Sequence, residues 1–379
     1  MKTTYVYLGV EKVAYQFSEE EIMLLKRDLE NKFMAIFNPK DGYYMRTGIL
    51  DEEGKDTGID PFMASFPELI DVGVMGSCVH GSSGLCIKSG VRCYQNGLNV
   101  HKRDMSLEEF KSIVDQCKGK TFQLALGGRG DVDQHANFEE ILAYCRDNSI
   151  VPNFTTSGLG MTPEIASICK KYCGAVAVSW YRSIYTLKAI EMLVVAGVTT
   201  NIHYVLGNSS IVEAIDRLYK NGFPDDINAV IFLLHKPIGL GTQEDVLKVG
   251  NKNVNTFFAL IDKMNFDFQV GFDSCTAPGI VNFTKNIDLD SIDFCEGARF
   301  SCYIDSEMNI MPCSFGNDDD KWFVSLNNST IKEAWNSQVF ENFRNHFKKA
   351  CPSCKDRLLC GNGCPIVNEI TLCERKERI

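Results

Sequence analysis

The sequence predicts an α/β protein with a parallel sheet, because strand-like and helix-like segments alternate through the middle of the chain. Six short apolar runs are expected to be strands: 68–75, 122–128, 151–157, 175–180, 199–206 and 229–234. Six segments with a helical spacing of apolar residues follow them: 107–117, 137–147, 163–172, 184–196, 211–221 and 254–264. Six such units are too few for a closed eight-fold barrel, so they fit either a partial barrel or a doubly wound sheet.

The chain is expected to have three regions. Residues 1–66 form an N-terminal add-on with a short strand, a helix that begins at Ser18 and a hairpin around residues 38–42. Residues 67–270 contain the alternating units. Residues 271–379 comprise a bridging segment and a cysteine-rich tail.

Charge and hydrophobicity exclude several classes of protein. Thirty-nine Lys and Arg against 49 Asp and Glu give a net charge of −10, which argues against non-specific nucleic-acid binding. No apolar run approaches a membrane span of about 20 residues, and the first residues lack the core of a signal peptide. We therefore expect a cytoplasmic protein with neither a nucleic-acid nor a membrane partner.

The 16 cysteines indicate metal or redox chemistry, since thiols without a secretory signal are expected to stay reduced. Cys78, Cys86 and Cys93 follow the first strand of the alternating region, with the spacing C-x7-C-x6-C in a glycine-rich loop. Three thiolates on one loop can hold three irons of a [4Fe–4S] cluster and leave the fourth iron open. A zinc site that includes His80, or three unrelated core cysteines, are the alternatives.

Eight cysteines crowd the tail, and their spacing is specific. The last five follow the pattern C-x2-C-x5-C-x3-C-x8-C, whereas a zinc ribbon is the plainer alternative. The eight are Cys295, Cys302, Cys313, Cys351, Cys354, Cys360, Cys364 and Cys373. Cys117, Cys145, Cys169 and Cys173 lie on helical stripes and are expected in the core.

These motifs resemble the radical S-adenosylmethionine (SAM) superfamily and, in the tail, its SPASM domain, which is found in peptide-modifying members. The resemblance covers residues 67–379 and implies a partial (β/α)6 barrel of the TIM type. The usual cysteine motif of the superfamily is C-x3-C-x-aromatic-C, so both gaps are longer here. Met308 stands where many SPASM sequences have a glycine.

The resemblance implies a SAM site at the ends of the strands. The segment Gly127-Gly128-Arg129-Gly130-Asp131 is similar to the family's GGxGE segment, which contacts the SAM amine, and two adjacent glycines allow a close backbone approach. Polar residues that end or lie in the later strands would complete the site, although each alone is compatible with local capping. The cofactor-binding candidates are Tyr94, Gly127, Gly128, Gly130, Asp131, Thr155, Ser157, Ser179, Asn201 and His203.

The resemblance also implies three [4Fe–4S] clusters, one that binds SAM and two auxiliary. By analogy with sulfatase maturases, Cys295, Cys302, Cys313 and Cys364 would hold the first auxiliary cluster. The second would be held by Cys351, Cys354, Cys360 and Cys373.

The function implied is a radical SAM maturase. SAM would be cleaved reductively to a 5′-deoxyadenosyl radical, with electrons from a donor such as flavodoxin or ferredoxin. The substrate would be a ribosomally made precursor peptide, most simply crosslinked through a thioether. Asp273, at the end of a possible seventh strand, and Cys275 are the catalytic candidates, although Asp273 could equally be an exposed carboxylate or a cap.

Two alternatives remain at this point. Sulfatase maturases make formylglycine and carry an Asp where Ser314 follows Cys313 here, so Asp273, Asp305 or Glu307 would have to take its place. A degenerate barrel would instead serve as an iron–sulfur electron carrier or a peptide-binding scaffold.

Overall fold

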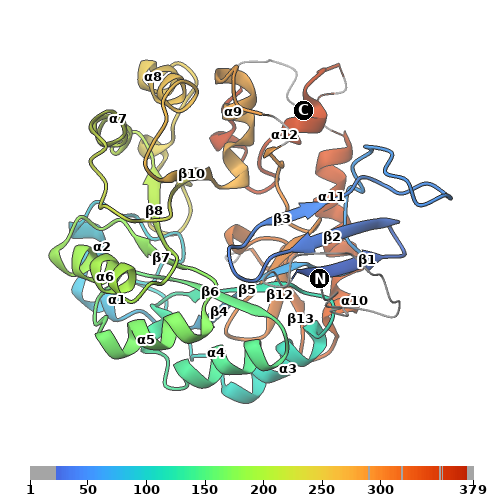
Figure 1. Cartoon of the computed structure of the whole chain (residues 1–379), viewed down its shortest axis with the longest axis horizontal. Coiled ribbons are helices and arrows are strands. Elements are labelled where there is room, and N and C mark those ends of the chain that lie inside the picture. Colours follow the sequence, from blue (N-terminus) through green and yellow to red (C-terminus); the bar gives the residue numbers. More distant parts are fainter. Residues whose placement is uncertain (1–22, 289–290, 317–318, 350, 352, 374–379) are drawn as a thin grey trace, which may run out of the picture.

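The central sheet is the frame on which every candidate residue is placed. The computed structural model describes residues 23–288, 291–316, 319–349, 351 and 353–373 (Figure 1). Seven strands pair in parallel in the order of the chain: β4 (Leu69–Met75), β5 (Gln123–Gly128), β6 (Val151–Thr156), β7 (Val176–Ser179), β8 (Thr200–Leu206), β9 (Ala229–Leu234) and β10 (Gln269–Phe272). The six expected strands are confirmed, and β10 is the seventh strand that ends just before Asp273.

The six expected helices connect these strands. They are α3 (Leu107–Cys117), α4 (Phe138–Asp147), α5 (Pro163–Tyr172), α6 (Ile184–Val195), α7 (Ile211–Lys220) and α8 (Lys252–Ile261). In Figure 1 they lie along the outer side of the curved sheet, which is the arrangement of a partial barrel. A doubly wound sheet would have helices on both faces, so that alternative is excluded.

The sheet continues into the C-terminal region. β11 (Ser301–Ile304) pairs in parallel with β4, and the antiparallel strands β12 (Asn309–Met311) and β13 (Val324–Ser325) follow. Within the described residues, the sheet therefore has ten strands and ends at β10 on one side and at β13 on the other. The sequence did not predict this extension, because three of its strands come from the cysteine-rich tail.

The N-terminal region forms a separate antiparallel sheet of β1 (Leu24–Asp28), β2 (Phe33–Phe37) and β3 (Tyr44–Arg46). The expected hairpin is confirmed, since Asn38 and Tyr43 are hydrogen-bonded across the turn. The expected short first strand and Ser18 lie outside the described residues. The first described strand, β1, alternates buried and less buried residues, as expected for a strand with one face on the core.

The C-terminal helices fasten the tail to the rest of the molecule. They are α9 (Ala277–Phe283), α10 (Ile331–Trp335), α11 (Gln338–Lys349) and α12 (Arg357–Cys360). The buried Trp335 Nε1 donates to Ala64 O at 2.9 Å, and Arg344 Nε donates to Ala298 O at 2.6 Å. In Figure 1 the blue N-terminal strands and α10 and α11 lie on the same side of the sheet.

The helical cysteines behave as core residues, as expected. Cys117, Cys145 and Cys169 are fully buried, and Cys173 packs against the same cluster. Burial raises the pKa of the Cys117 thiol to about 12, so it stays protonated near neutral pH. None of the helices in the described part of the chain is both long and apolar enough for a membrane span.

Trp335→Phe is expected to lower the free energy of unfolding by about 2 kcal/mol, because it leaves the Ala64 carbonyl without its donor and removes buried ring volume. Urea denaturation measures this loss. Trp322→Phe is the matched control, since the Trp322 Nε1 has no hydrogen-bond partner among the residues described. Equal losses in the two variants would show that the Trp335 bond contributes little.

Candidate active site and cysteine groups

The first three cysteines lie on the loop that leaves β4. Two short helices, α1 (Val79–Ser83) and α2 (Leu85–Lys88), fold this loop, and Gly84 joins them in a left-handed conformation. The loop is anchored to the segment after β9, because Leu240 N donates to Cys93 O at 2.9 Å. Cys86 is buried, while Cys78 and Cys93 are partly exposed.

The three thiols border one common place, which the Tyr181 side chain also reaches. The pKa of the Tyr181 hydroxyl is raised first by burial, and then by the charges of Asp131, Cys93, Cys86 and Cys78. All three cysteines must therefore lie close to this hydroxyl. Three thiols on one side, with a carboxylate beside them, fit a cluster that is bound through three irons.

Asp131 is fixed by a buried hydrogen-bond network at this place. Ser157 N donates to Asp131 Oδ1 at 3.0 Å, and Ser157 Oγ also bonds the carboxylate. His80 Nε2 lies 2.7 Å from Ser157 Oγ and 3.1 Å from Asp131 Oδ2. His80 thus contacts the predicted SAM-binding residues, a role that sequence reasoning missed when it considered the residue only as a zinc ligand.

The glycines after β5 have two different roles. A Cβ on Gly128 would lie 2.3 Å from Met75 O, and one on Gly130 would lie 2.3 Å from Ser77 O, so both positions require glycine for packing. A Cβ on Gly127 would meet nothing within 4 Å. The backbone at Gly127 therefore faces open space, which fits the close approach of a bound ligand.

A second layer of candidates lies on β6, β7 and β8. Thr155 Oγ1 is 3.4 Å from His203 Nδ1, and Ser179 is the neighbour of His203 in the β7–β8 register. Burial lowers the pKa of His203 to about 4, against a smaller opposing effect of Asp273, so the imidazole is neutral at pH 7. Asn201 is set apart, because it lies at the start of β8 and accepts a hydrogen bond from Asn228.

Tyr94 packs toward the tail of the chain. Its ring lies 4.7 Å from the ring of Phe315, centroid to centroid, and the residue remains 37% exposed. Lys236 Nζ lies 4.4 Å from the same Phe315 ring. The predicted aromatic neighbour of SAM is thus part of the contact between the barrel and the cysteine-rich tail.

The tail thiols form two groups. In the first, Cys275 is hydrogen-bonded to Cys364. Cys275 and Cys313 both contribute to the raised pKa of the Cys295 thiol. In the second, Cys351, Cys354 and Cys373 all lie near Cys360, whose pKa is raised mainly by burial and then by these thiolates. The membership of the second group is the one the sequence implied, whereas the first contains Cys275 and lacks Cys302.

Of the two catalytic candidates, Cys275 belongs to the first group and Asp273 lies beside it. Asp273 forms an ion pair with the buried Lys236 and accepts a hydrogen bond from Thr276 Oγ1 at 2.7 Å. Burial alone would lower the pKa of Lys236, but the charges of Asp273 and Cys275 outweigh it and raise the pKa. Lys236 therefore remains a buried cation between the barrel and the tail.

The other two carboxylates considered for catalysis are occupied elsewhere. Asp305 is fully buried and accepts hydrogen bonds from the backbone of Glu307 and Asn309 in the β11–β12 turn. Glu307 forms an ion pair with Lys102 at the surface. Of the three carboxylates, only Asp273 lies beside a thiol group.

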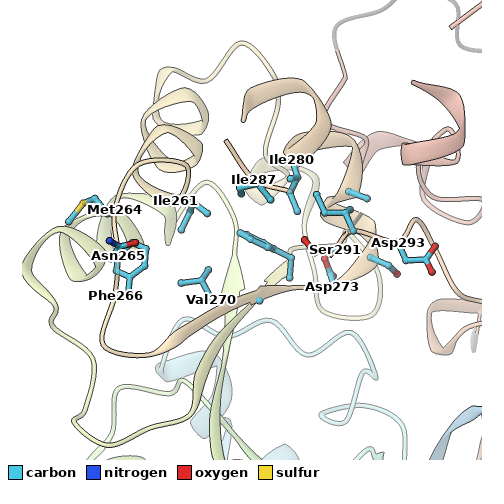
Figure 2. A pocket seen from close by; sticks show the side chains of 15 residues that line it. Ile261, Met264, Asn265, Phe266, Val270, Asp273, Ile280, Ile287, Ser291 and Asp293 are labelled. Carbon is cyan, nitrogen blue, oxygen red and sulfur yellow. The ribbon is translucent and has the colours of Figure 1, made fainter. Parts of the chain in front are cut away.

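A pocket of about 450 Å³ opens next to Asp273 (Figure 2). Its wall is mostly apolar and comes from α8, β10 and α9, with Ile261, Val270 and Ile280 as examples. Figure 2 shows Asp273, Ser291 and Asp293 together at one side of this wall. The pocket thus combines an apolar surface with carboxylates at one end.

Asp71 is an interior residue that the sequence analysis did not select. It lies on β4, and burial raises the pKa of its carboxyl to about 7. The sequence does contain a signal for this residue, because Asp71 is the one ionisable residue in the otherwise apolar run LIDVGVM. A charge in a buried strand marks a position with a special environment.

No three His, Cys, Asp or Glu side chains of the described residues are placed so that they could surround one metal ion. A [4Fe–4S] cluster does not require this, because each cysteine binds a different iron. The wider thiol groups are therefore compatible with clusters rather than with a single ion.

The fold and the site together define the class, and comparisons with known proteins agree. Residues 295–357 match the SPASM family model, described as an iron–sulfur cluster-binding domain. The fold is similar to that of solved proteins with S-adenosylmethionine bound. The tail thus contains a SPASM domain, as the sequence indicated.

Particular relatives extend this result. The mycofactocin maturase MftC of Mycolicibacterium smegmatis is 22% identical over 312 residues, which are 74% of this chain and 75% of that protein. SuiB of Streptococcus suis with bound S-adenosylmethionine has a TM-score of 0.66 at 12% identity, over 96% of this chain and 100% of that one. SuiB bound to its precursor peptide SuiA gives 0.65 at 12% identity, over 94% and 98%. The protein anSMEcpe with bound AdoMet gives 0.57 at 16% identity, over 82% and 89%.

Gly239→Ala is expected to displace the loop that carries Cys93, because the new Cβ would lie 2.3 Å from Tyr94 O and 2.8 Å from Cys93 O. Iron bound after anaerobic reconstitution should fall by up to about four atoms per chain, the content of one [4Fe–4S] cluster. Gly160→Ala is the control, since Gly160 has a similar left-handed φ but open space around it. Undiminished iron in the Gly239 variant would show that the contact does not position the cysteine.

His203→Gln is expected to remove a pH dependence of stability. The pKa of His203 falls to about 4 in the folded chain, so the unfolded chain takes up the proton first as the pH falls below about 6.5. From pH 7 to pH 5 the wild type should lose about 2 kcal/mol of unfolding free energy relative to the variant. Urea midpoints at both pH values measure the difference, and parallel pH profiles would contradict the buried neutral state.

Proposed function

We propose that this chain cleaves SAM reductively and uses the radical to modify a ribosomally made precursor peptide, most simply by forming a thioether or related crosslink. One observation carries the proposal. Cys78, Cys86 and Cys93 lie around one place beside the Asp131 network, and two further thiol groups pack on the same barrel.

The residues present suit the cofactors. Cys78, Cys86 and Cys93 would hold the first [4Fe–4S] cluster, and the open space at Gly127 would admit SAM. When bound, this pair supplies a 5′-deoxyadenosyl radical after one-electron reduction, and auxiliary clusters supply an acceptor for an electron. The reducing electron would come from a partner such as flavodoxin or ferredoxin.

The chain's own residues orient the ligand and keep water away. Both oxygens of Asp131 are engaged by Ser157, so the carboxylate keeps one orientation and can accept a hydrogen bond from an amine. The rings of Tyr181 and Tyr185 lie 6.2 Å and 6.4 Å from the ring of His80. These side chains surround the buried network with aromatic surface.

The substrate assignment is supported by the pocket and by the relatives. A pocket of about 450 Å³ with an apolar wall has room for one or two peptide side chains. Two of the relatives, SuiB and anSMEcpe, have been solved with peptides bound. We infer that the peptide enters beside Asp273.

A thioether requires the loss of two hydrogens, one from a thiol and one from a C–H bond. The C–H hydrogen leaves as an atom, whereas the thiol proton leaves together with one electron from the substrate. We assign Asp273 as the proton acceptor, because its carboxylate lies in the wall of the pocket where the peptide would enter and is held in place by Lys236. The formylglycine alternative lacks the Asp after Cys313, where Ser314 stands.

Cys86→Ala is expected to abolish formation of 5′-deoxyadenosine from SAM under dithionite, by at least about 100-fold, because one of three cluster thiolates is lost. Cys354→Ala should retain SAM cleavage but lose peptide product, since it alters only the second tail group. Chromatography of both products makes the test. Wild-type chain that binds iron but never cleaves SAM would support the electron carrier or scaffold instead.

A further inference from the structure

Cys302 is placed where it cannot join the first tail group. It lies on β11 in register with Ile70 of β4, and Tyr303 is in register with Asp71. Successive side chains on a strand point to opposite faces. The Tyr303 hydroxyl lies near Gly73 and Gln95 on the inner face, so Cys302 points to the helix layer.

The surroundings of Cys302 agree with this direction. The residue is 2% exposed, and the groups that affect its pKa include Cys117 on α3 and Arg344 on α11. Both belong to elements that pack behind the sheet. None of the other tail thiols is among the groups that affect it.

Cys275 has the opposite placement. It lies in the short turn 274–276 between β10 and α9. This turn faces the tail, because α9 packs against α12 of the tail. Asn282 Nδ2 donates to Leu372 O at 3.3 Å, and a Cβ on Gly279 would lie 3.0 Å from the Leu372 side chain. The turn is thereby held against the segment that carries Cys364 and Cys373.

The contacts of Cys275 complete a four-thiol group. Its thiol is hydrogen-bonded to that of Cys364. It also lies close enough to Cys295 and Cys313 to raise the pKa of both thiols. Cys313 also contributes to the raised pKa of Cys295. Four cysteines from four separate segments therefore meet at one place, as the four irons of a cluster require.

We propose that Cys275, and not Cys302, is the fourth ligand of the first auxiliary [4Fe–4S] cluster, together with Cys295, Cys313 and Cys364. This inference rests on the proposed function only in that it takes the tail to bind clusters. On binding, the Cys275 thiol gives up its proton to become a thiolate ligand, and Cys302 stays a protonated core thiol. Cys275 is then unavailable to bind substrate, and the cluster has no open iron, which suits an electron acceptor.

The Lys236 ammonium adds to this assignment. It is buried next to Asp273 and its charge acts on Cys275, Cys364 and Cys313. A cation beside four thiolates offsets part of their negative charge, which favours the reduced cluster. Lys236 is a positioning residue here, since its effect reaches the cluster through charge.

The test uses the full chain with Cys78, Cys86 and Cys93 all changed to Ala, so that only auxiliary clusters remain. In that background we expect about eight irons per chain after anaerobic reconstitution. Cys275→Ala is then added in one protein and Cys302→Ala in a second, matched protein. EPR spectra of the reduced proteins are recorded with and without imidazole, which binds an iron that lacks a cysteine.

Imidazole should shift the EPR signal of one cluster in the Cys275 variant and leave the Cys302 variant unchanged. A shift in the Cys302 variant, or none in the Cys275 variant, would overturn the assignment while leaving the auxiliary clusters intact. A triple-alanine background that binds no iron would instead refute the cluster part of the proposed function. Thermal melts of both variants show whether either change merely unfolds the chain. If the Cys275→Ala protein unfolds, Cys275→Ser replaces it. An altered EPR signal is then expected, and an unaltered signal overturns the assignment.

Discussion

The open sheet of this protein is held together where its two edges approach each other. Cys275 follows β10 at one edge, Cys313 follows β12 near the other, and the two thiols lie close together. The ion pair of Lys236 with Asp273 and the packing of Tyr94 on Phe315 join the same two sides. A partial barrel has no strand pairing to close it, so these side-chain contacts connect the two sides, as hydrogen bonds between strands do in a closed barrel.

The parallel pairing of β11 with β4 makes this closure possible. It places the tail directly next to the strand that leads into Cys78, so the loop of the first three cysteines and the tail lie on neighbouring strands. Trp335 and Arg344 then fasten α10 and α11 to this part of the molecule. The tail is thus an extension of the barrel sheet rather than an appended module.

Burial shifts the pKa values of two ionisable groups inside the barrel in opposite directions. His203 is neutral because burial disfavours its cation, and Asp71 holds its proton more tightly because burial disfavours its anion. Burial thus shifts both groups toward their neutral forms. That property suits radical chemistry, where unwanted proton transfer and water are to be excluded.

The sequence by itself determined the alternation of strands and helices, the concentration of cysteines in the loop after β4 and in the tail, and the core positions of Cys117, Cys145 and Cys169. These features depend on local spacing, which a linear sequence carries directly. Only the tertiary structure decided that β11 joins the sheet, that His80 contacts Asp131, and that the thiol of Cys275 lies beside that of Cys364. The physical reason is that strand register and face are set by pairing between distant segments, and a cysteine's sequence spacing does not tell on which face of a strand its thiol lies.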